Sequence, residues 1–407
     1  MDKMNETFIV QRALTKNESK GQSGDCSFSK YPVPGSLQQI STRVAFFIAG
    51  FGISAWAPLI PYAKDRLGID EGVLGLLLLC LGAGSIITMP IAGALAARFG
   101  CRLMIGAATV LICASLPFLA MVASVPALVI VLLIFGAAIG AVDVVVNIQA
   151  VIVEKASGKA MMSGFHGLWS VGGFVGAGGV SGLLWMGVSP LVAVLCVIVV
   201  IVGLLLTFGR HLLPYGTEDK DGPLFVLPKG IVLFIGFLCF IVFLAEGSML
   251  DWSAVFLTSL RGVDFSQAGL GYSLFSVTMM IGRLSGDRIV QKFGGKQILI
   301  FGGICAASGI AIAIFIPTWI ASLIGFGLVG LGASNIVPVL YSVLGRQKVM
   351  PANLAVSAVT TLGYSGILVG PALIGAIAHI TSLSFAFLIV AAMLLIVTAS
   401  SRVVAKS

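Results

Sequence analysis

Twelve long apolar runs dominate this 407-residue sequence and leave few folds open to it. Each run has about 20 residues or more, the length that an α-helix needs to cross the hydrocarbon core of a bilayer. Charged residues make up 10% of the chain, against about 25% in a soluble protein. The sequence therefore predicts an all-α polytopic membrane protein with 12 transmembrane helices. We place the runs at 42–63, 73–97, 102–123, 125–153, 162–186, 189–209, 230–257, 267–287, 297–316, 318–345, 352–378 and 383–404.

The longest hydrophilic break between runs, 210–229, divides them into two sets of six. We therefore expect an N-terminal six-helix bundle over 40–209, a cytoplasmic linker over 210–229 and a C-terminal six-helix bundle over 230–407. Residues 1–39 are polar and lack an apolar core, so they predict a disordered cytosolic tail and not a signal peptide.

The basic residues predict the orientation. Of the 24 Lys and Arg residues, all except Lys64, Arg66 and Arg261 fall on the side of the N-terminal tail. Because cytoplasmic loops carry the excess of Lys and Arg, we expect both termini in the cytoplasm. This pattern also explains the net charge of +8, so no nucleic-acid partner is expected. No Lys or Arg is assigned deep within an apolar run, which argues against an anionic substrate.

The two sets of six resemble each other. Gly172-x-x-x-Gly176 recurs as Gly366-x-x-x-Gly370 at an offset of 194 residues, and the Gly-Ala-Val-Asp of 140–143 recurs as the Gly-Ala-Ser-Asn of 332–335 at 192. Matches in the same order at nearly one offset indicate an internal duplication. Two pseudo-symmetric six-helix bundles with a site between them near the bilayer midplane are typical of secondary transporters.

Asp143 is the only charge in the fourth run as far as residue 153. A carboxylate near the middle of a membrane helix costs on the order of 3 kcal/mol, so it usually faces the protein interior or water. We expect Asp143 to carry a proton; the alternative is a structural carboxylate that is hydrogen-bonded to Asn147 or His166. Small and polar residues share its face of the helix, at Gly136, Gly140, Asp143 and Asn147.

Two loops resemble the signature loop of the major facilitator superfamily. Residues 93–102, Gly-Ala-Leu-Ala-Ala-Arg-Phe-Gly-Cys-Arg, are similar to the family's Gly-x-Leu-x-Asp-Arg-x-Gly-Arg-Arg, with Ala97 at the position of the aspartate. Residues 286–296 resemble the second copy, which keeps its acid as Asp287. The resemblance covers 41–404 and implies two six-helix bundles that alternate access to a central site. Gating roles are expected for Arg98, Arg102, Asp287 and Arg288, and by its place near the outer end of its run for Asp251.

Shorter stretches at 165–170, 245–252 and 330–334 are similar to a bacterial inner-membrane branch of the superfamily. That branch consists mostly of uncharacterised permeases, is distantly related to fucose permease and is grouped with a rhizopine-associated membrane protein. Fucose permease is a proton–sugar symporter with a carboxylate on its fourth helix, and Asp143 looks like the matching position. The resemblance implies a location in the bacterial inner membrane.

Other polar groups in the runs are candidates for coupling or binding. Glu246 is expected as a second coupling carboxylate, with an acid satisfied by helix contacts as the alternative. His166 is expected to relay protons or to bind a hydroxyl, unless it only caps or packs at the interface. Uncharged polar and aromatic side chains suit a sugar-like solute, although helix–helix hydrogen bonds and interfacial anchoring explain them as well. The expected substrate-binding residues are Asn147, Gln149, Trp169, Asn335, Tyr341, Tyr364 and Trp56.

The sequence thus predicts a monomeric, proton-coupled secondary transporter in the lipid bilayer. Its expected substrate is a small neutral or cationic solute, sugar-like or polyol-like. Proton-driven efflux of amphipathic drugs or metabolites would use the same carboxylates, and a non-transporting membrane sensor is a further alternative because Ala97 replaces the family's acid. No nucleophile–base pair, metal-ligand set or cofactor motif is found, so we expect no enzyme activity, no cofactor and no metal.

Overall fold

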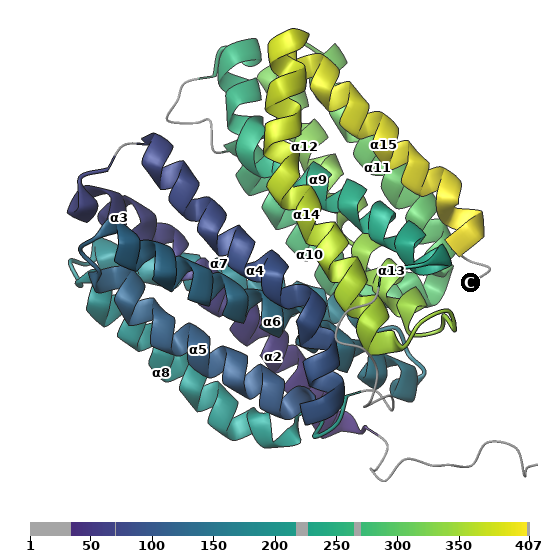
Figure 1. Ribbon diagram of the computed structural model, residues 1–407. Coiled ribbons are helices and arrows are strands. Elements are labelled where there is room, and N and C mark those ends of the chain that lie inside the picture. Colours follow the sequence, from purple (N-terminus) through teal and green to yellow (C-terminus); the bar gives the residue numbers. More distant parts are fainter. Residues whose placement is uncertain (1–33, 70, 217–226, 264–269, 405–407) are drawn as a thin grey trace, which may run out of the picture. The chain divides into compact units, whose positions relative to one another are not determined.

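The computed structural model describes residues 34–69, 71–216, 227–263 and 270–404. Residues 35–407 form one compact unit. Most of the expected N-terminal tail and the middle of the expected linker lie outside the described residues. Within the described ranges the chain is helical and has no strand, so the expected all-α fold is confirmed (Figure 1).

The first half of the chain begins earlier than expected, because α2 starts at Ser36. The Gln38 side chain accepts a hydrogen bond from the Gly35 N–H at 2.9 Å, which satisfies a group that the helix itself leaves free. The first apolar run is also interrupted, since Pro58 opens a separate 3-10 turn after α2. The elements of this half are α2 Ser36–Ser54, η1 Ala57–Leu59, α3 Ile60–Leu67, α4 Glu71–Phe99, α5 Cys101–Met121, α6 Val125–Ser157, α7 Met162–Trp185, α8 Pro190–Phe208 and η2 Gly209–His211.

The second half contains a helix that breaks inside an apolar run. The tenth run, expected to be continuous, divides at Ser334 and Asn335 into two helices. Pro338 explains the break, because proline has no N–H to give to the carbonyl of Ser334, four residues earlier, and its ring crowds that carbonyl. The elements are α9 Gly230–Arg261, α10 Leu270–Phe293, α11 Gly295–Phe315, α12 Trp319–Ala333, α13 Ile336–Leu344, α14 Ala352–Ile380 and α15 Leu383–Val404.

Eleven segments of the described chain are long and apolar enough to cross a membrane. They include α2 joined to η1, and α12 joined to α13. The twelfth expected span corresponds to α10, which is long enough at 24 residues but too polar to meet the same composition. Its charges are Arg283, Asp287, Arg288 and Lys292.

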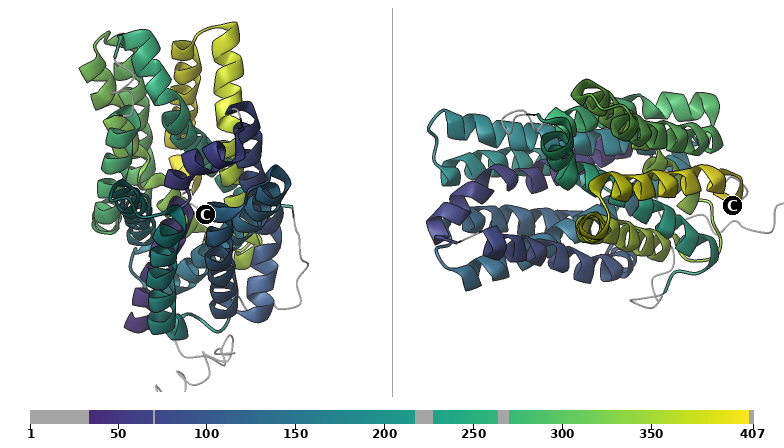
Figure 2. Two further views of the ribbon diagram at one scale, coloured as in Figure 1. Left: turned by 90° about the vertical axis from the view of Figure 1, so that its left-hand side faces the viewer. Right: turned by 90° about the horizontal axis from the view of Figure 1, so that it is seen from above.

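The two halves repeat the same pairs of packed helices, and Figure 2 shows the helices from two further sides. In the first half α4 packs on α6, α2 on α7 and α5 on α8; in the second half α10 packs on α12, α9 on α14 and α11 on α15. The two halves meet mainly through α4 against α14 and α7 against α10. Because these two contacts are related by the same repeat, the interface between the halves is itself pseudo-symmetric.

Repeated glycines allow the closest of these helix contacts. A Cβ atom on Gly172 would collide with the carbonyl oxygen of Phe47, and one on Gly176 would lie 2.5 Å from the carbonyl oxygen of Phe51. Their repeat mate Gly366 meets the backbone of Phe240 in the same way. The small-residue motif therefore sets the spacing of α2 from α7 and of α9 from α14.

Candidate functional site

One end of the bundle carries most of the basic residues, and we call it the basic end. There α4 and α10 finish, with Arg98 and Lys292 in their last turns. The described chain also starts and ends there, at the beginning of α2 and the end of α15. The other end is called the opposite end.

A cavity of about 500 Å³ lies between the two halves. Its walls come from α2, η1 and α7 of the first half and from α9, α10 and α14 of the second half. The lining extends from Arg283 and Glu246, midway along their helices, to Ser54 and Ala57 towards the opposite end. The cavity therefore runs from the middle of the bundle towards the opposite end.

Arg283 is the cation among the residues that line this cavity. Its Nη2 atom lies 3.1 Å from Oε1 of Glu246, and its Nη1 donates to the Ser170 hydroxyl at 3.2 Å. Its Nε donates to the Ser334 carbonyl at 3.4 Å, the carbonyl that the break before α13 leaves free. The guanidinium thus links α9, α7 and the broken helix, and its side chain is 9% exposed.

The expectation that no basic residue lies deep in an apolar run was wrong. It placed the end of the eighth helix at 287 and grouped Arg283 with the basic loop. The helix α10 in fact continues to Phe293, so Arg283 lies ten residues, about 15 Å, inside it. With Arg283 inside the bundle, the absence of a buried cation no longer excludes an anionic substrate.

Asp143 lies near the middle of α6 and is partly exposed. The Asn147 amide donates to its Oδ1 at 3.2 Å and to its backbone carbonyl at 2.9 Å, as expected of residues one turn apart. Among the described residues no cation lies within ion-pair distance of Asp143. The helix α6 packs against α13 and α14 of the second half, which carry Tyr341 and Tyr364, so Asp143 belongs to a helix at the seam between the halves.

His166 lies one turn inside α7 between two aromatic rings. Its ring centroid is 5.3 Å from that of Phe46 and 5.8 Å from that of Tyr341, in the second half. Its Nε2 atom is buried and has no hydrogen-bond partner among the described residues. The Ser170 hydroxyl, which accepts a hydrogen bond from Arg283, donates to the backbone carbonyl of His166 at 3.2 Å. His166 therefore belongs to the same polar cluster as Arg283.

Asn335 and the two tyrosines make other contacts on the second-half side of the seam. The Asn335 amide donates to the Gly282 carbonyl at 2.9 Å, which fixes α10 to the broken helix, while its buried Oδ1 has no partner in the described chain. Tyr341 is 2.6 Å from the Thr360 hydroxyl. Tyr364 lies on α14, the helix that packs against α4 of the first half.

Of the predicted coupling and substrate-binding residues, Glu246 and Trp169 line the central cavity, and the others lie outside its lining. Both ends of the Gln149 amide are occupied within the first half, by Thr42 at 2.9 Å and by the Leu213 N–H at 3.1 Å. Trp56 is buried and is not part of the cavity lining, whereas Trp169 lines it. Asp251 is exposed, as are the arginines Arg98, Arg102 and Arg288.

The basic end is closed by contacts between α7 and α10. The N–H of Gly164, in the first turn of α7, donates to Oδ1 of Asp287 at 3.0 Å. The Gln291 amide donates to the Ala160 carbonyl at 3.0 Å. On the other side of the same helix end, Glu154 of α6 accepts the N–H groups of Met161 and Met162 at 2.7 Å each. Two carboxylates, one from each half, thus cap a single helix.

The repeat-related contact between α4 and α14 closes the basic end without a charge. The Asn353 amide donates to the Gly93 carbonyl at 3.2 Å, and the Ser357 hydroxyl donates to the Met89 carbonyl. Ala97, at the expected acid position, is buried. The hydrogen bonds between the described residues of α4 and α14 thus use neutral amide and hydroxyl groups. Arg102 binds the chain after α8, donating to the Leu212 carbonyl at 2.9 Å.

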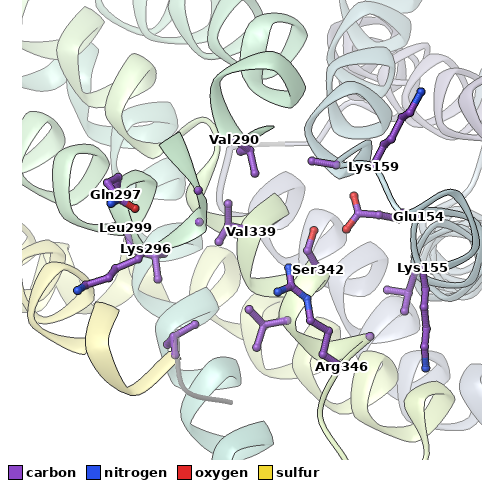
Figure 3. A pocket seen from close by; sticks show the side chains of 18 residues that line it. Glu154, Lys155, Lys159, Val290, Lys296, Gln297, Leu299, Val339, Ser342 and Arg346 are labelled. Carbon is purple, nitrogen blue, oxygen red and sulfur yellow. The ribbon is translucent and has the colours of Figure 1, made fainter. Parts of the chain in front are cut away.

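A second cavity, of about 630 Å³, lies at the basic end (Figure 3). Glu154, Lys155 and Lys159 line it from the first half, and Lys296 and Arg346 from the second. In Figure 3 the Glu154 carboxylate points towards the second half, while Lys159 and Lys296 extend in opposite directions. This cavity lies beyond the cross-half contacts of α7 and α10 and does not join Asp143 or Glu246.

Comparison with known proteins identifies a family model and several proteins that are similar to this chain. The family model described as Major Facilitator Superfamily matches residues 44–349 and, in a second match, 249–405. An uncharacterised MFS-type transporter of Yersinia pestis is 58% identical over 373 residues, which cover 92% of this chain and 97% of that protein. The membrane protein MosC of Rhizobium meliloti is 31% identical, over 88% of this chain and 89% of its own length. The crystal structure of the fucose:proton symporter of E. coli has a TM-score of 0.76 at 15% identity, covering 90% of this chain and 98% of that one.

Proposed function

Because this chain belongs to the Major Facilitator Superfamily and is a multi-pass membrane transporter, we propose that it moves a small solute together with protons across the bacterial inner membrane. With the basic end in the cytoplasm, as the distribution of Lys and Arg predicts, the central cavity faces outward. The cross-half contacts at Asp287 and Asn353 then form the closed cytoplasmic side. Transport requires these contacts to break as the opposite end closes around the solute.

The observation that carries this proposal is the contrast between the two central acids. Glu246 is paired with Arg283 at 3.1 Å, so its negative charge is already compensated. Asp143 has an amide neighbour, Asn147, and no cation at ion-pair distance among the described residues. An acid without a cation can bind and release a proton with little rearrangement, and Asp143 lies on a helix at the seam where hydration changes between states. We therefore assign proton coupling to Asp143.

The cavity lining supports a solute with hydroxyl groups. Ser54, Ser170 and Tyr272 bring hydroxyls to the wall, and Trp169 offers a flat apolar face of the kind on which sugar rings stack. The similarity in fold to a fucose:proton symporter is in keeping with this class of solute.

The test is gradient-driven uptake into proteoliposomes that contain the purified full chain. A panel of sugars, polyols, sugar acids and amines is offered with and without an inside-alkaline pH gradient. With a gradient of one pH unit, which corresponds to about 1.4 kcal/mol, wild-type protein should accumulate a member of the panel up to about tenfold for each proton that moves with the solute. Asp143→Asn should accumulate clearly less solute than wild type, because the proton carried by Asp143 is lost, while still exchanging solute across the membrane. Asp65→Asn removes an exposed acid with no assigned role and serves as the matched control.

Accumulation by Asp143→Asn equal to that of wild type would refute the assignment of proton coupling. No uptake and no exchange of any panel member by wild-type protein would refute the proposed transport of such solutes.

A further inference from the structure

Two of the residues that line the central cavity are charged, Glu246 and Arg283, and they are paired with each other. We propose that the transported solute carries a carboxylate, and that this group binds Arg283 in the place that Glu246 occupies in the solute-free structure. The inference rests on the proposed function, because it names the substrate class of the same cavity.

The hydrogen-bond donors of Arg283 are only partly used. A guanidinium has five N–H donors and binds a carboxylate best through two parallel hydrogen bonds. Glu246 takes one bond through Oε1, Ser170 takes a second, and the Ser334 carbonyl takes a third at 3.4 Å. Two N–H groups remain without a partner among the described residues. The pair with Glu246 is thus a single-bonded one that a better-placed carboxylate can replace.

The Arg283 side chain is held in a fixed position. The break before α13 frees the Ser334 carbonyl, which holds Nε, and Ser170 holds the guanidinium from the other half of the protein. A group held on both sides is oriented before the ligand arrives, which lowers the entropy lost on binding. An anion on Arg283 would also touch both halves, as a solute must if it is to control their movement.

The negative charge of a solute carboxylate can be compensated inside the cavity. When a solute carboxylate replaces Glu246 on Arg283, the freed Glu246 carboxylate can bind one proton from solution, forming an O–H bond. The site then has the same net charge as before, with one anion and one proton added. In the loaded cavity every charge is again paired or neutralised, which avoids the cost of burying an unpaired one.

The remaining lining defines the body of the solute. Trp169, Phe174, Phe275 and Met279 give the cavity apolar walls, whereas Ser54 provides a hydroxyl near its outer part. A volume of about 500 Å³ falls in the usual range of small-molecule sites. We infer a small monocarboxylate with a hydroxylated or aromatic body, such as a sugar acid.

A test that needs no knowledge of the solute is the rescue of Glu246→Ala by formate. Removal of the Glu246 side chain leaves Arg283 unpaired beside an empty space. Formate in the millimolar range should then raise the midpoint of thermal unfolding of the purified variant in a dose-dependent manner, and formamide should not. The double variant Glu246→Ala with Arg283→Gln should lose this response, and wild-type protein should show less of it than Glu246→Ala. An unchanged midpoint of Glu246→Ala with formate would overturn the proposal, as would an equal response in the double variant.

Uptake then separates this inference from the proposed function. Glucuronate and glucose, and galacturonate and galactose, differ by a carboxylate at one carbon and are compared in proteoliposomes. The acid of a pair should be preferred about tenfold or more by wild-type protein, and Arg283→Gln should abolish the preference. Lys292→Gln, which removes an exposed cation on the same helix, should keep it. Proton-coupled uptake of the neutral sugars alone would overturn the inference and leave the proposed function standing.

Discussion

At the scale of single residues, the first turn of α7 has an unusual pair of caps. Its free N–H groups are satisfied by Glu154 from the preceding helix and by Asp287 from the other half of the protein. A carboxylate at a helix N-terminus is stabilising because it accepts hydrogen bonds and opposes the helix dipole. The cap from Asp287 exists only while the basic end is closed, so its stabilising effect acts on that one conformation.

Asp287→Ala should therefore weaken the closed state by about 1 kcal/mol, the typical cost of losing a cap. The expected result is faster hydrogen exchange of the backbone amides at the start of α7, measured by mass spectrometry on the full chain in nanodiscs. Asp287→Asn retains an oxygen that can accept the Gly164 N–H and should show a smaller effect. Arg288→Ala is the control, since its side chain is exposed. Exchange in Asp287→Ala at the wild-type rate would show that the cap contributes nothing.

The site was partly predictable from individual residues. Asp143 was visible as a lone acid in an apolar run, and its bond to Asn147 followed from helical spacing. Arg283 was missed because charge patterning alone grouped it with the basic loop. A signal was present, since Arg283 lies four residues before Asp287 and a helix that buries one face at this spacing places both on it. Its partner Glu246 comes from another helix, and no local pattern in the sequence identifies that pairing.

At the scale of helices, glycines decide how closely the elements approach. Gly172 lies against the backbone of α2, whereas Gly178, on the same helix, has open space where a Cβ would be. In the sequence the Gly-x-x-x-Gly motif indicated only an internal duplication, and the helix that packs against it became known from the fold. A glycine motif of this kind predicts a close contact with another helix but does not identify that helix.

Gly172→Ala should lower the stability of the protein by about 1–3 kcal/mol, because the added methyl group forces α2 and α7 apart. Thermal unfolding in detergent, followed by size-exclusion fluorescence, would show this as a reduced midpoint. Gly178→Ala adds the same methyl group to open space and should leave the midpoint unchanged or slightly raised. Equal midpoints for the two variants would contradict the assigned packing.

The broken helix shows the limit of reading apolar runs. Hydropathy made the tenth run look continuous, because the residues around the break are themselves apolar or small. Pro338 was the local cue, and the Ser334 carbonyl that it frees is used by Arg283 from another helix. The break is tolerated inside the bundle because such contacts satisfy the freed backbone groups.

At the scale of the whole molecule, the two cross-half contacts are related by the repeat but differ in chemistry. The contact of α7 with α10 uses the charged Asp287, and that of α4 with α14 uses the neutral Asn353 and Ser357. The duplication and the division into halves were predictable, since repeated motifs and the long hydrophilic break survive in the sequence. The replacement at Ala97 was visible too, but the neutral groups that form this contact lie more than 250 residues away and only folding brings them there.

A bulky residue at Gly93 should open both contacts at once. A Cβ on Gly93 would lie 2.6 Å from the Asn353 carbonyl oxygen and 2.8 Å from the Ser357 Cβ, so Gly93→Leu overpacks only the closed basic end. A cost of about 1–3 kcal/mol acts on that state alone. If the halves move as rigid bodies, hydrogen exchange should rise at the start of α7, far from the substitution in sequence. Gly106→Leu, which meets open space, is the control. A rise confined to α4 and α14 would show that the two contacts open independently.

Because α7 shares its caps between the two halves, the number of its helical residues differs between the two conformations. When the halves separate at the basic end, the Gly164 N–H loses its acceptor, and the first turn keeps only the cap from Glu154. That turn is then the part of α7 most prone to unwind, so the helix would be about one turn longer in one conformation than in the other. Opening would increase the conformational entropy of this turn, and closing would reduce it again. This entropy difference would contribute to the free-energy difference between the two conformations.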